Sequence, residues 1–124
     1  MKVVIDTSVL IDILRGVEHP LNLIKNLMRE NELFISGITE AEIFSGKDLE
    51  KKERRQKVLE VLSIFQKINP TNEIFQKAGE FRRKYNTSLP DSIIAATAYY
   101  LNAEILTKNE KDFSKIKEVR LLRL

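Results

Sequence analysis

The sequence predicts an α/β fold: a three-layer α/β/α sandwich around a central, mainly parallel sheet. Short β-branched segments alternate along the chain with longer segments whose apolar residues recur at helical spacing. This alternation is typical of parallel sheets whose crossover helices cover both faces. With 124 residues, 43% of them hydrophobic, we expect a single domain over residues 1–124 with enough apolar side chains for its own core.

The first predicted strand covers residues 2–5, a β-branched run that ends at Asp6. Apolar residues between Val9 and Leu14 then predict a short helix. Gly16 follows two residues later and suits the left-handed position at which many helices stop.

Pro20 opens the second predicted helix, whose apolar positions continue at helical spacing to Met28. Residues 33–36 form the second predicted strand. A third helix is expected over residues 39–44, and Gly46 ends it.

Residues 48–57 are almost wholly polar, but they lead into residues 58–65, which carry apolar side chains at helical spacing. This pattern predicts one long helix, solvated at its start and buried at its end. Ile68, just before Asn-Pro, predicts a very short strand.

The last part of the chain completes the alternation of helices and strands. We expect helices over residues 71–85 and 88–101, a strand over residues 104–107, a short helix over residues 111–114 and a final strand over residues 119–122. The Ala-rich helix over residues 88–101 is expected to be buried.

The composition excludes several kinds of site. The chain has no cysteine, so it has no disulfide, thiol nucleophile or cysteine-ligated zinc site. No secretory signal and no apolar run of about 18 residues is present, and we expect a soluble, cytoplasmic protein. The net charge of +3 is compatible with nucleic-acid binding.

Five polar residues fall at strand ends or in first turns of predicted helices. In a parallel α/β sheet, ligands bind at the carboxyl ends of the strands. Asp6 follows the first strand, Asn109 and Asp112 follow the fourth, and Glu42 and Asp91 lie early in helices that would face the same cleft. The sequence therefore predicts a cluster of carboxylates at one edge of the sheet.

Several carboxylates in one cleft stay ionised together only if a cation lies between them. Oxygen ligands of this kind suit Mg²⁺ or Mn²⁺. Such ions activate water and stabilise charge on a phosphodiester. The cluster thus favours metal-dependent phosphodiester chemistry.

Each acid also has a purely structural interpretation. Asp6 could cap the helix that follows it. Glu42 ends Thr-Glu-Ala-Glu, a capping-box pattern, and Asp91 ends Ser-Leu-Pro-Asp, a favoured helix start. Asp112 could be a solvated acid in a turn. Only their occurrence together, in this order, favours the functional interpretation.

Four segments of the chain resemble the motifs of the PIN-domain family, in the same order. They are Met-Lys-Val-Val-Ile-Asp6-Thr7-Ser8, Ile38-Thr-Glu-Ala-Glu42-Ile, Leu89-Pro-Asp91-Ser-Ile-Ile-Ala-Ala and Leu106-Thr-Lys-Asn109-Glu-Lys-Asp112-Phe. The size resembles that of the VapC toxins of toxin–antitoxin pairs. The resemblance covers residues 1–113 and implies a PIN-like fold.

The resemblance implies a Mg²⁺-dependent endoribonuclease, with Mn²⁺ as an alternative ion, that cuts RNA with a metal-activated water. It implies that Asp6, Glu42, Asp91 and Asp112 are the catalytic acids, with Asp6 and Asp91 as metal ligands. Thr7 and Ser8 would lie near the first acid.

The fourth motif departs from the fully acidic pattern of the family. The equivalent of the fourth acid is either Asn109, two residues after Thr107, or Asp112, just before the phenylalanine. Thr107 and Asn109 are therefore expected as secondary site residues. The sequence does not decide whether the site binds one metal ion or two.

The resemblance also implies partners: an RNA substrate, a small VapB-type antitoxin and a second copy in a homodimer, with Tyr100 as a candidate interface residue. A basic stretch from Lys47 to Lys57 is interpreted as a solvated helix face, with a phosphate-tracking or antitoxin-binding surface as the alternative. A catalytically silent PIN-like module that binds RNA or protein is the alternative function. A receiver-type signalling domain is disfavoured because no predicted central strand ends in a phosphoacceptor aspartate.

Overall fold

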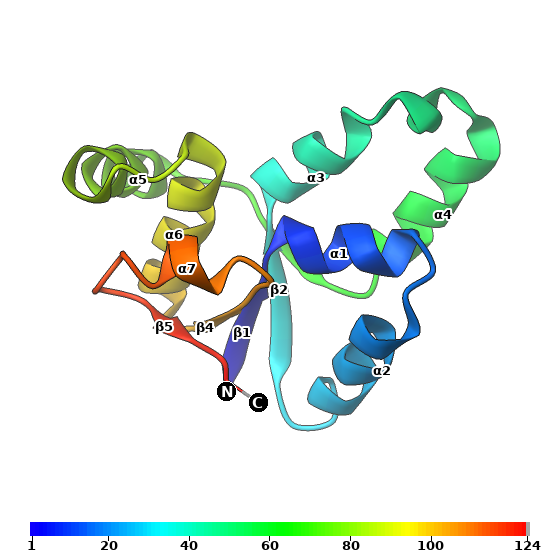
Figure 1. Ribbon diagram of the computed structural model, residues 1–124, viewed down its shortest axis with the longest axis horizontal. Helices are drawn as coiled ribbons and strands as arrows, with labels where there is room; N and C mark the ends of the chain where they lie inside the picture. Colours follow the sequence, from blue (N-terminus) through cyan, green and yellow to red (C-terminus); the bar gives the residue numbers. More distant parts are fainter. Residues whose placement is uncertain (124) are drawn as a thin grey trace.

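The computed structural model describes residues 1–123, which form a five-stranded sheet with helices on both faces (Figure 1). The strand order is β3-β2-β1-β4-β5 and every neighbouring pair is parallel. The strands are β1 (Lys2–Ile5), β2 (Glu32–Ser36), β3 (Gln66–Ile68), β4 (Glu104–Leu106) and β5 (Arg120–Leu121). The predicted α/β sandwich is confirmed, with a wholly parallel sheet in the described residues.

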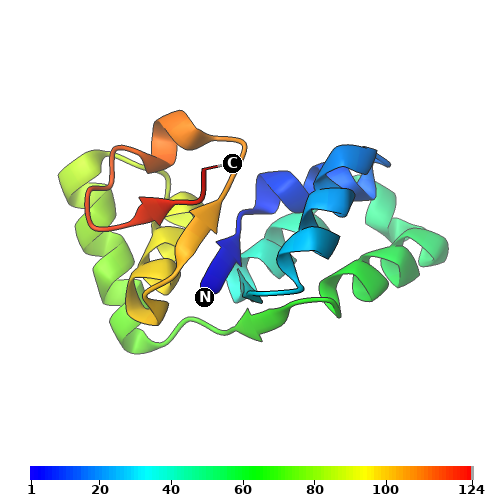
Figure 2. The ribbon, with the colours of Figure 1, turned by 90° about the horizontal axis from the view of Figure 1, so that it is seen from below.

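The helices divide between the two faces of the sheet. They are α1 (Thr7–Leu14), α2 (Glu18–Leu27), α3 (Gly37–Phe44), the 3-10 helix η1 (Lys47–Glu50), α4 (Lys52–Leu62), α5 (Asn72–Tyr85), α6 (Leu89–Leu101) and α7 (Glu110–Phe113). In Figures 1 and 2, α1, α2 and α4 lie on one side of the sheet and α5, α6 and α7 on the other. No helix in residues 1–123 has the length and apolarity to cross a membrane.

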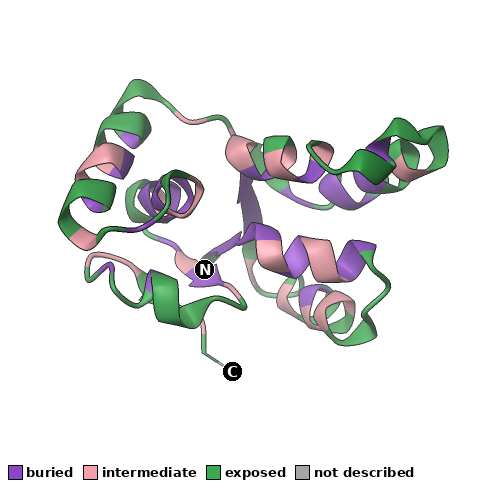
Figure 3. Ribbon diagram, turned by 45° about the horizontal axis from the view of Figure 1, so that its top comes forward, coloured by how far each residue is buried: buried purple, intermediate pink, exposed green. Residues whose placement is uncertain are grey.

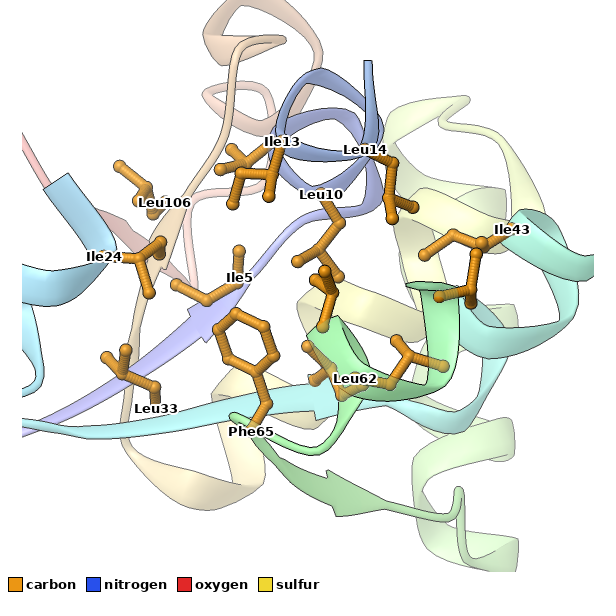
Figure 4. Close-up of a cluster of buried hydrophobic side chains, with 14 of the residues drawn as sticks. Ile5, Leu10, Ile13, Leu14, Ile24, Leu33, Ile43, Leu62, Phe65 and Leu106 are labelled. Atoms are coloured by element: carbon orange, nitrogen blue, oxygen red, sulfur yellow. The ribbon is translucent and has the colours of Figure 1, made fainter. Parts of the chain in front are cut away.

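Two apolar clusters, one on each face, hold the layers together. In β1, Val3 and Ile5 point into the cluster under α1, α2 and α4 (Figure 4), whereas Val4 points into the cluster under α5 and α6. This is the two-residue alternation of a strand that is buried on both sides. In Figure 3 most of the central strands β1, β2 and β4 and the inward faces of the helices are buried, while the outer helical faces are exposed.

The expected single helix over residues 48–65 is wrong, because η1 and α4 are separate. Lys51 has extended backbone angles, with φ −79° and ψ 129°, and breaks the run. The break lets Leu49 bury its side chain. Arg55 then donates to the freed carbonyl oxygens of Leu49 and Glu50 at 3.0 and 2.7 Å, which satisfies the end of η1.

Two helices begin earlier than the sequence pattern predicts. Helix α2 starts at Glu18, so Pro20 lies within its first turn, where proline removes no intrahelical hydrogen bond. Helix α3 is capped by Ser36, whose hydroxyl accepts a hydrogen bond from the Ile38 amide at 3.2 Å. Thr39 is therefore inside the helix, and its buried side chain is free for a tertiary contact.

Candidate functional site

The predicted acids gather at the carboxyl edge of the sheet, where the strand order reverses. The chain runs from β1 to β2 and β3 on one side of β1, then places β4 on its other side. Asp6 directly follows β1, and its amide donates to the Leu106 carbonyl at the end of β4 at 2.9 Å. Asp6 thus lies at the topological switch point of the sheet, the usual ligand position in this class of fold.

Asp6 is 2% exposed and accepts two hydroxyl hydrogen bonds. Ser8 Oγ and Thr107 Oγ1 each donate to its Oδ2 at 2.7 Å. Although Asp6 occupies the N-cap position of α1, its side chain makes no capping hydrogen bond. Helix capping therefore does not explain this carboxylate. Among the hydrogen bonds of residues 1–123, none ends on Oδ1, so that oxygen is available to another ligand.

The loop after β4 is fastened to Asp6 and to α1. The Thr107 hydroxyl accepts from the Asn109 amide at 2.9 Å, and the Ser8 hydroxyl accepts from the Lys108 amide at 3.2 Å. Lys108 Nζ lies 2.5 Å from Asp12 Oδ2, so a side chain of the loop is paired with α1 as well.

Glu42, in the second turn of α3, faces α1 rather than its own helix start. Thr7 Oγ1 donates to Glu42 Oε1 at 2.7 Å and lies 2.9 Å from Thr39 Oγ1. The capping-box interpretation of Glu42 is therefore wrong. Partial burial raises the pKa of Glu42, the Thr7 hydrogen bond opposes this, and the charge of Asp6 adds to the rise.

Asp91, in the first turn of α6, is half-buried and has a raised pKa. The Ser88 hydroxyl caps this helix by accepting from the Asp91 amide at 3.2 Å. Burial raises the pKa of Asp91 to about 6, with further contributions from the charges of Asp6, Asp112 and Glu42, and Ser88 opposes the rise. Asp91 thus experiences the charge of every other predicted acid.

The two candidates for the fourth position differ in their surroundings. Asn109 is the N-cap residue of α7 and holds Thr107 through its backbone amide. Asp112 is exposed, lies 4.0 Å from Lys115 and contributes to the raised pKa of Asp91. Of the two, Asp112 is therefore the residue whose charge acts on Asp91.

The donor set fits a hard divalent cation. Carboxylate oxygens are the preferred ligands of Mg²⁺ and Mn²⁺, and Asp6 Oδ1 accepts no hydrogen bond in the described part of the chain. Burial first, and then the charges of the other acids, raise the pKa of Asp91, and a cation beside it would oppose both effects. Within residues 1–123, no three acidic or imidazole side chains form a ready-made coordination cluster.

A cleft of about 190 Å³ lies between α1, α3, η1 and α4, and of the predicted acids its lining includes Glu42. Apolar side chains from all four elements line it as well, together with Arg15 and Arg54. Arg54 donates to the Leu14 carbonyl at 3.2 Å and to Asp48 at 3.1 Å. The most basic stretch of the sequence therefore supplies one arginine that joins α4 to the end of α1, in addition to solvated lysines.

Ser8 contacts Asp6 directly, as the family resemblance implies. Two further neighbours, Asp12 and Lys108, were not among the predicted site residues, and they join α1 to the β4 loop. Ser8 and Asp12 are four positions apart in α1, which places them on one helical face. The sequence therefore indicates that Ser8 and Asp12 lie on one face of a helix. Their shared partner, Lys108, can be identified only from the fold.

Comparison with known proteins agrees with this architecture. The family model for the PIN domain matches residues 3–119. Ribonuclease VapC10 of Mycobacterium tuberculosis is 30% identical over 123 residues, 95% of this chain and 90% of that protein. A toxin-antitoxin complex from Klebsiella pneumoniae contains a chain with 32% identity and a TM-score of 0.80, with 94% of both chains covered.

A second solved structure is similar along the whole chain. VapBC2 from Rickettsia felis, bound to a DNA fragment from its promoter, has a TM-score of 0.83 and 25% identity, covering 100% of this chain and 99% of that one. With the family model matched over residues 3–119 and relatives of nearly equal length, this chain belongs to the PIN domain family.

Proposed function

We propose that this protein is a metal-dependent endoribonuclease and the toxin of a VapBC-type toxin–antitoxin pair. The observation that carries the proposal is the convergence of charge at the switch point, where Asp91 has its pKa raised to about 6 by burial and by the other acids. Similarity to Ribonuclease VapC10 supports RNA as the substrate. The proposed ion is Mg²⁺, with Mn²⁺ as a substitute.

The proposed roles rest on the resemblance to the PIN-domain motifs, together with the contacts and charges at the site. Asp6 and Asp91 are the metal ligands, Glu42 and Asp112 complete the catalytic acids, and Thr7, Thr107 and Asn109 are secondary residues that orient them. A divalent cation bound there would lower the pKa of a water and stabilise negative charge on the phosphate.

The chain's own groups prepare the site for this reaction. Ser8 and Thr107 fix the Asp6 carboxylate through Oδ2, which leaves Oδ1 available to a cation. The raised pKa of Glu42 suits it to take a proton from the attacking water on its second oxygen, while Thr7 holds the first. This assignment leaves the phosphodiester to be positioned by the bound cation and the surrounding acids.

The proposed partners rest on the relatives. A small VapB-type antitoxin is proposed from the toxin-antitoxin complexes that the chain resembles. We further propose that residues 1–124 act as one PIN-like domain, that two copies form a homodimer, for which exposed Tyr99 and Tyr100 are candidate contacts, and that the protein acts in the cytoplasm.

Incubating the purified protein with structured RNA tests the function. Cleavage is expected in Mg²⁺, and its loss is expected in EDTA and in Asp6→Asn. Glu73→Gln, which neutralises an exposed acid in the first turn of α5, is the matched control and should cut normally. Persistent cleavage in EDTA or in Asp6→Asn contradicts the metal mechanism. Absence of cleavage in Mg²⁺ and Mn²⁺ on several RNAs favours the silent binding module instead.

A further inference from the structure

Helix α1 holds Lys108 at two points. The Ser8 hydroxyl accepts from the Lys108 amide at 3.2 Å, and Asp12 Oδ2 lies 2.5 Å from Lys108 Nζ. Ser8 and Asp12 share a helical face because they are one turn apart. A single face of α1 therefore binds both the backbone and the side chain of one residue in the β4 loop.

The loop in turn sets the direction of the two hydroxyls on Asp6. Ser8 and Thr107 each donate to Asp6 Oδ2, and each accepts a backbone N–H from the loop, from Lys108 and Asn109 respectively. A hydroxyl has one proton to donate, and its lone pairs accept. When a backbone N–H occupies a lone pair of the hydroxyl oxygen, the hydroxyl proton is left to point at the Asp6 carboxylate. Displacing the loop would misdirect both donors.

The two amide contacts alone are weak anchors. Lys108 and Asn109 are exposed, so water competes for the amides of this loop. The Asp12 side chain, by contrast, is only 15% exposed. An ion pair with one desolvated partner holds its geometry better than a fully solvated pair, and removing one member leaves a poorly hydrated charge.

We propose that Asp12 and Lys108 are positioning residues for the reaction. Their ion pair fixes residues 107–109 against α1 and so keeps the Ser8 and Thr107 hydroxyls directed at Asp6, the proposed metal ligand. The inference rests on the proposed function, and it adds two residues that touch neither substrate nor metal. It also gives Lys108 a role other than binding an RNA phosphate, because its ammonium group is already paired with Asp12.

Steady-state kinetics of RNA cleavage with single and double variants test the proposal. Asp12→Asn and Lys108→Gln should each lower kcat about tenfold, the scale of a small loss of orientation, while KM for RNA stays within about twofold. The double variant should be no worse than either single variant, because both remove the same ion pair. Lys108→Arg preserves the pair and should retain most of the activity.

A second ion pair provides the control. Lys77 Nζ and Glu80 Oε2 are 2.7 Å apart within α5, neither residue forms a hydrogen bond or ion pair with a proposed site residue in the described part of the chain, and Glu80→Gln should leave kcat and KM unchanged. Thermal unfolding of every variant separates loss of fold from loss of orientation. The proposal is overturned if Lys108→Gln raises KM and Asp12→Asn does not, which would make Lys108 a phosphate contact, or if the two effects multiply.

Two measurements do not depend on activity. Amide hydrogen exchange of Lys108 and Asn109, followed by NMR, should accelerate about tenfold in Asp12→Asn as the loop opens more often. Mn²⁺ affinity measured by calorimetry should fall in the same variant and remain normal in Glu80→Gln. Unchanged exchange and affinity reject the positioning role even if the wild-type protein cuts RNA. A wild-type protein that cuts no RNA rejects the proposed function while leaving these two readouts interpretable.

Discussion

On the β1–β4 side of the site, Asp6 is 2% exposed and has two hydroxyl donors on one oxygen. On the α3–α6 side, burial and neighbouring charges raise the pKa of both Glu42 and Asp91, and for Asp91 the value reaches about 6. Thr7 and Ser88 oppose these rises without removing them. On the first side, fixed hydrogen-bond donors compensate the buried charge of Asp6. On the second side, the charges of Glu42 and Asp91 are only partly compensated.

The contrast shows where this fold keeps room for a cation. A buried carboxylate is tolerated when hydrogen-bond donors surround it, and it is costly otherwise. Full compensation on both sides would make a stable edge of a sheet with little affinity for a metal. The under-compensated side is therefore the part of the site that a divalent ion should stabilise.

Adding a divalent cation should produce the largest change in stability. With Mg²⁺ or Mn²⁺ at about 100 times its Kd, the free energy of unfolding at pH 7.5 should rise by about 2.7 kcal/mol. The gain should shrink at pH 5, since Asp91 takes up a proton as the pH falls through about 6, and that proton competes with the ion. Thermal unfolding with metal and with EDTA at both pH values measures this. An equal gain at both pH values would contradict the role of Asp91.

On the compensated side, Thr107→Val should destabilise the protein by about 1–3 kcal/mol, because it removes a donor from a buried carboxylate. Thr107→Ser keeps the hydroxyl and should unfold close to the wild type. Urea denaturation in EDTA compares the three proteins. If valine is tolerated as well as serine, the hydroxyl contributes nothing to holding Asp6.

On the under-compensated side, Asp91→Asn should stabilise the protein, whereas Thr107→Val destabilises it. A raised pKa means that stability is fully present below the unfolded value of 3.8 and is lost as the pH rises through about 6. Asparagine avoids that loss, so in EDTA at pH 7.5 it should stabilise by about 1–2 kcal/mol once solvent screening is allowed for. The gain should vanish near pH 4. Urea denaturation across this pH range checks it, and destabilisation at pH 7.5 would remove the contrast between the two sides.

The smallest effect is expected for Glu42→Gln. Its carboxylate also has a raised pKa, but Thr7 donates to it and opposes the rise. The substitution should therefore stabilise the metal-free protein at pH 7.5 by less than Asp91→Asn does. Chemical denaturation of both variants side by side makes the comparison, and a larger gain for Glu42→Gln would reverse the proposed order of compensation.

The layered fold could be predicted from local patterns, since β1 and the helix after Ser88 carry their own boundary signals. The break at Lys51 could not, because it depends on burial of Leu49 and on Arg55 reaching the carbonyls of η1. Helical periodicity in that region is compatible with a continuous helix, and tertiary contacts decide otherwise.

The acids of the site were predictable as a set, while their supporting contacts were only partly so. Asp6 follows a strand and Asp91 lies in a helical first turn, both of which the sequence marks, whereas Glu42 lies one turn further into α3 than the sequence pattern indicates. Pairings such as Thr7 with Glu42, or Asp12 with Lys108, join residues far apart in the chain. No local pattern specifies them, because they exist only once the strands have been ordered.

The central position of β1 has a consequence for the order in which the protein is made. Thr107 and Asp6 are 101 residues apart in sequence, and β4, which brings them together, pairs with the first strand to be synthesised. A ribosome that has released residues 1–88 has exposed β1, β2 and β3 but neither Asp91 nor β4. The nascent chain therefore lacks a complete acid cluster for most of its synthesis. The cluster can form only when the last sixth of the polypeptide emerges. In a protein proposed to cut RNA, the topology postpones that activity until translation is nearly finished.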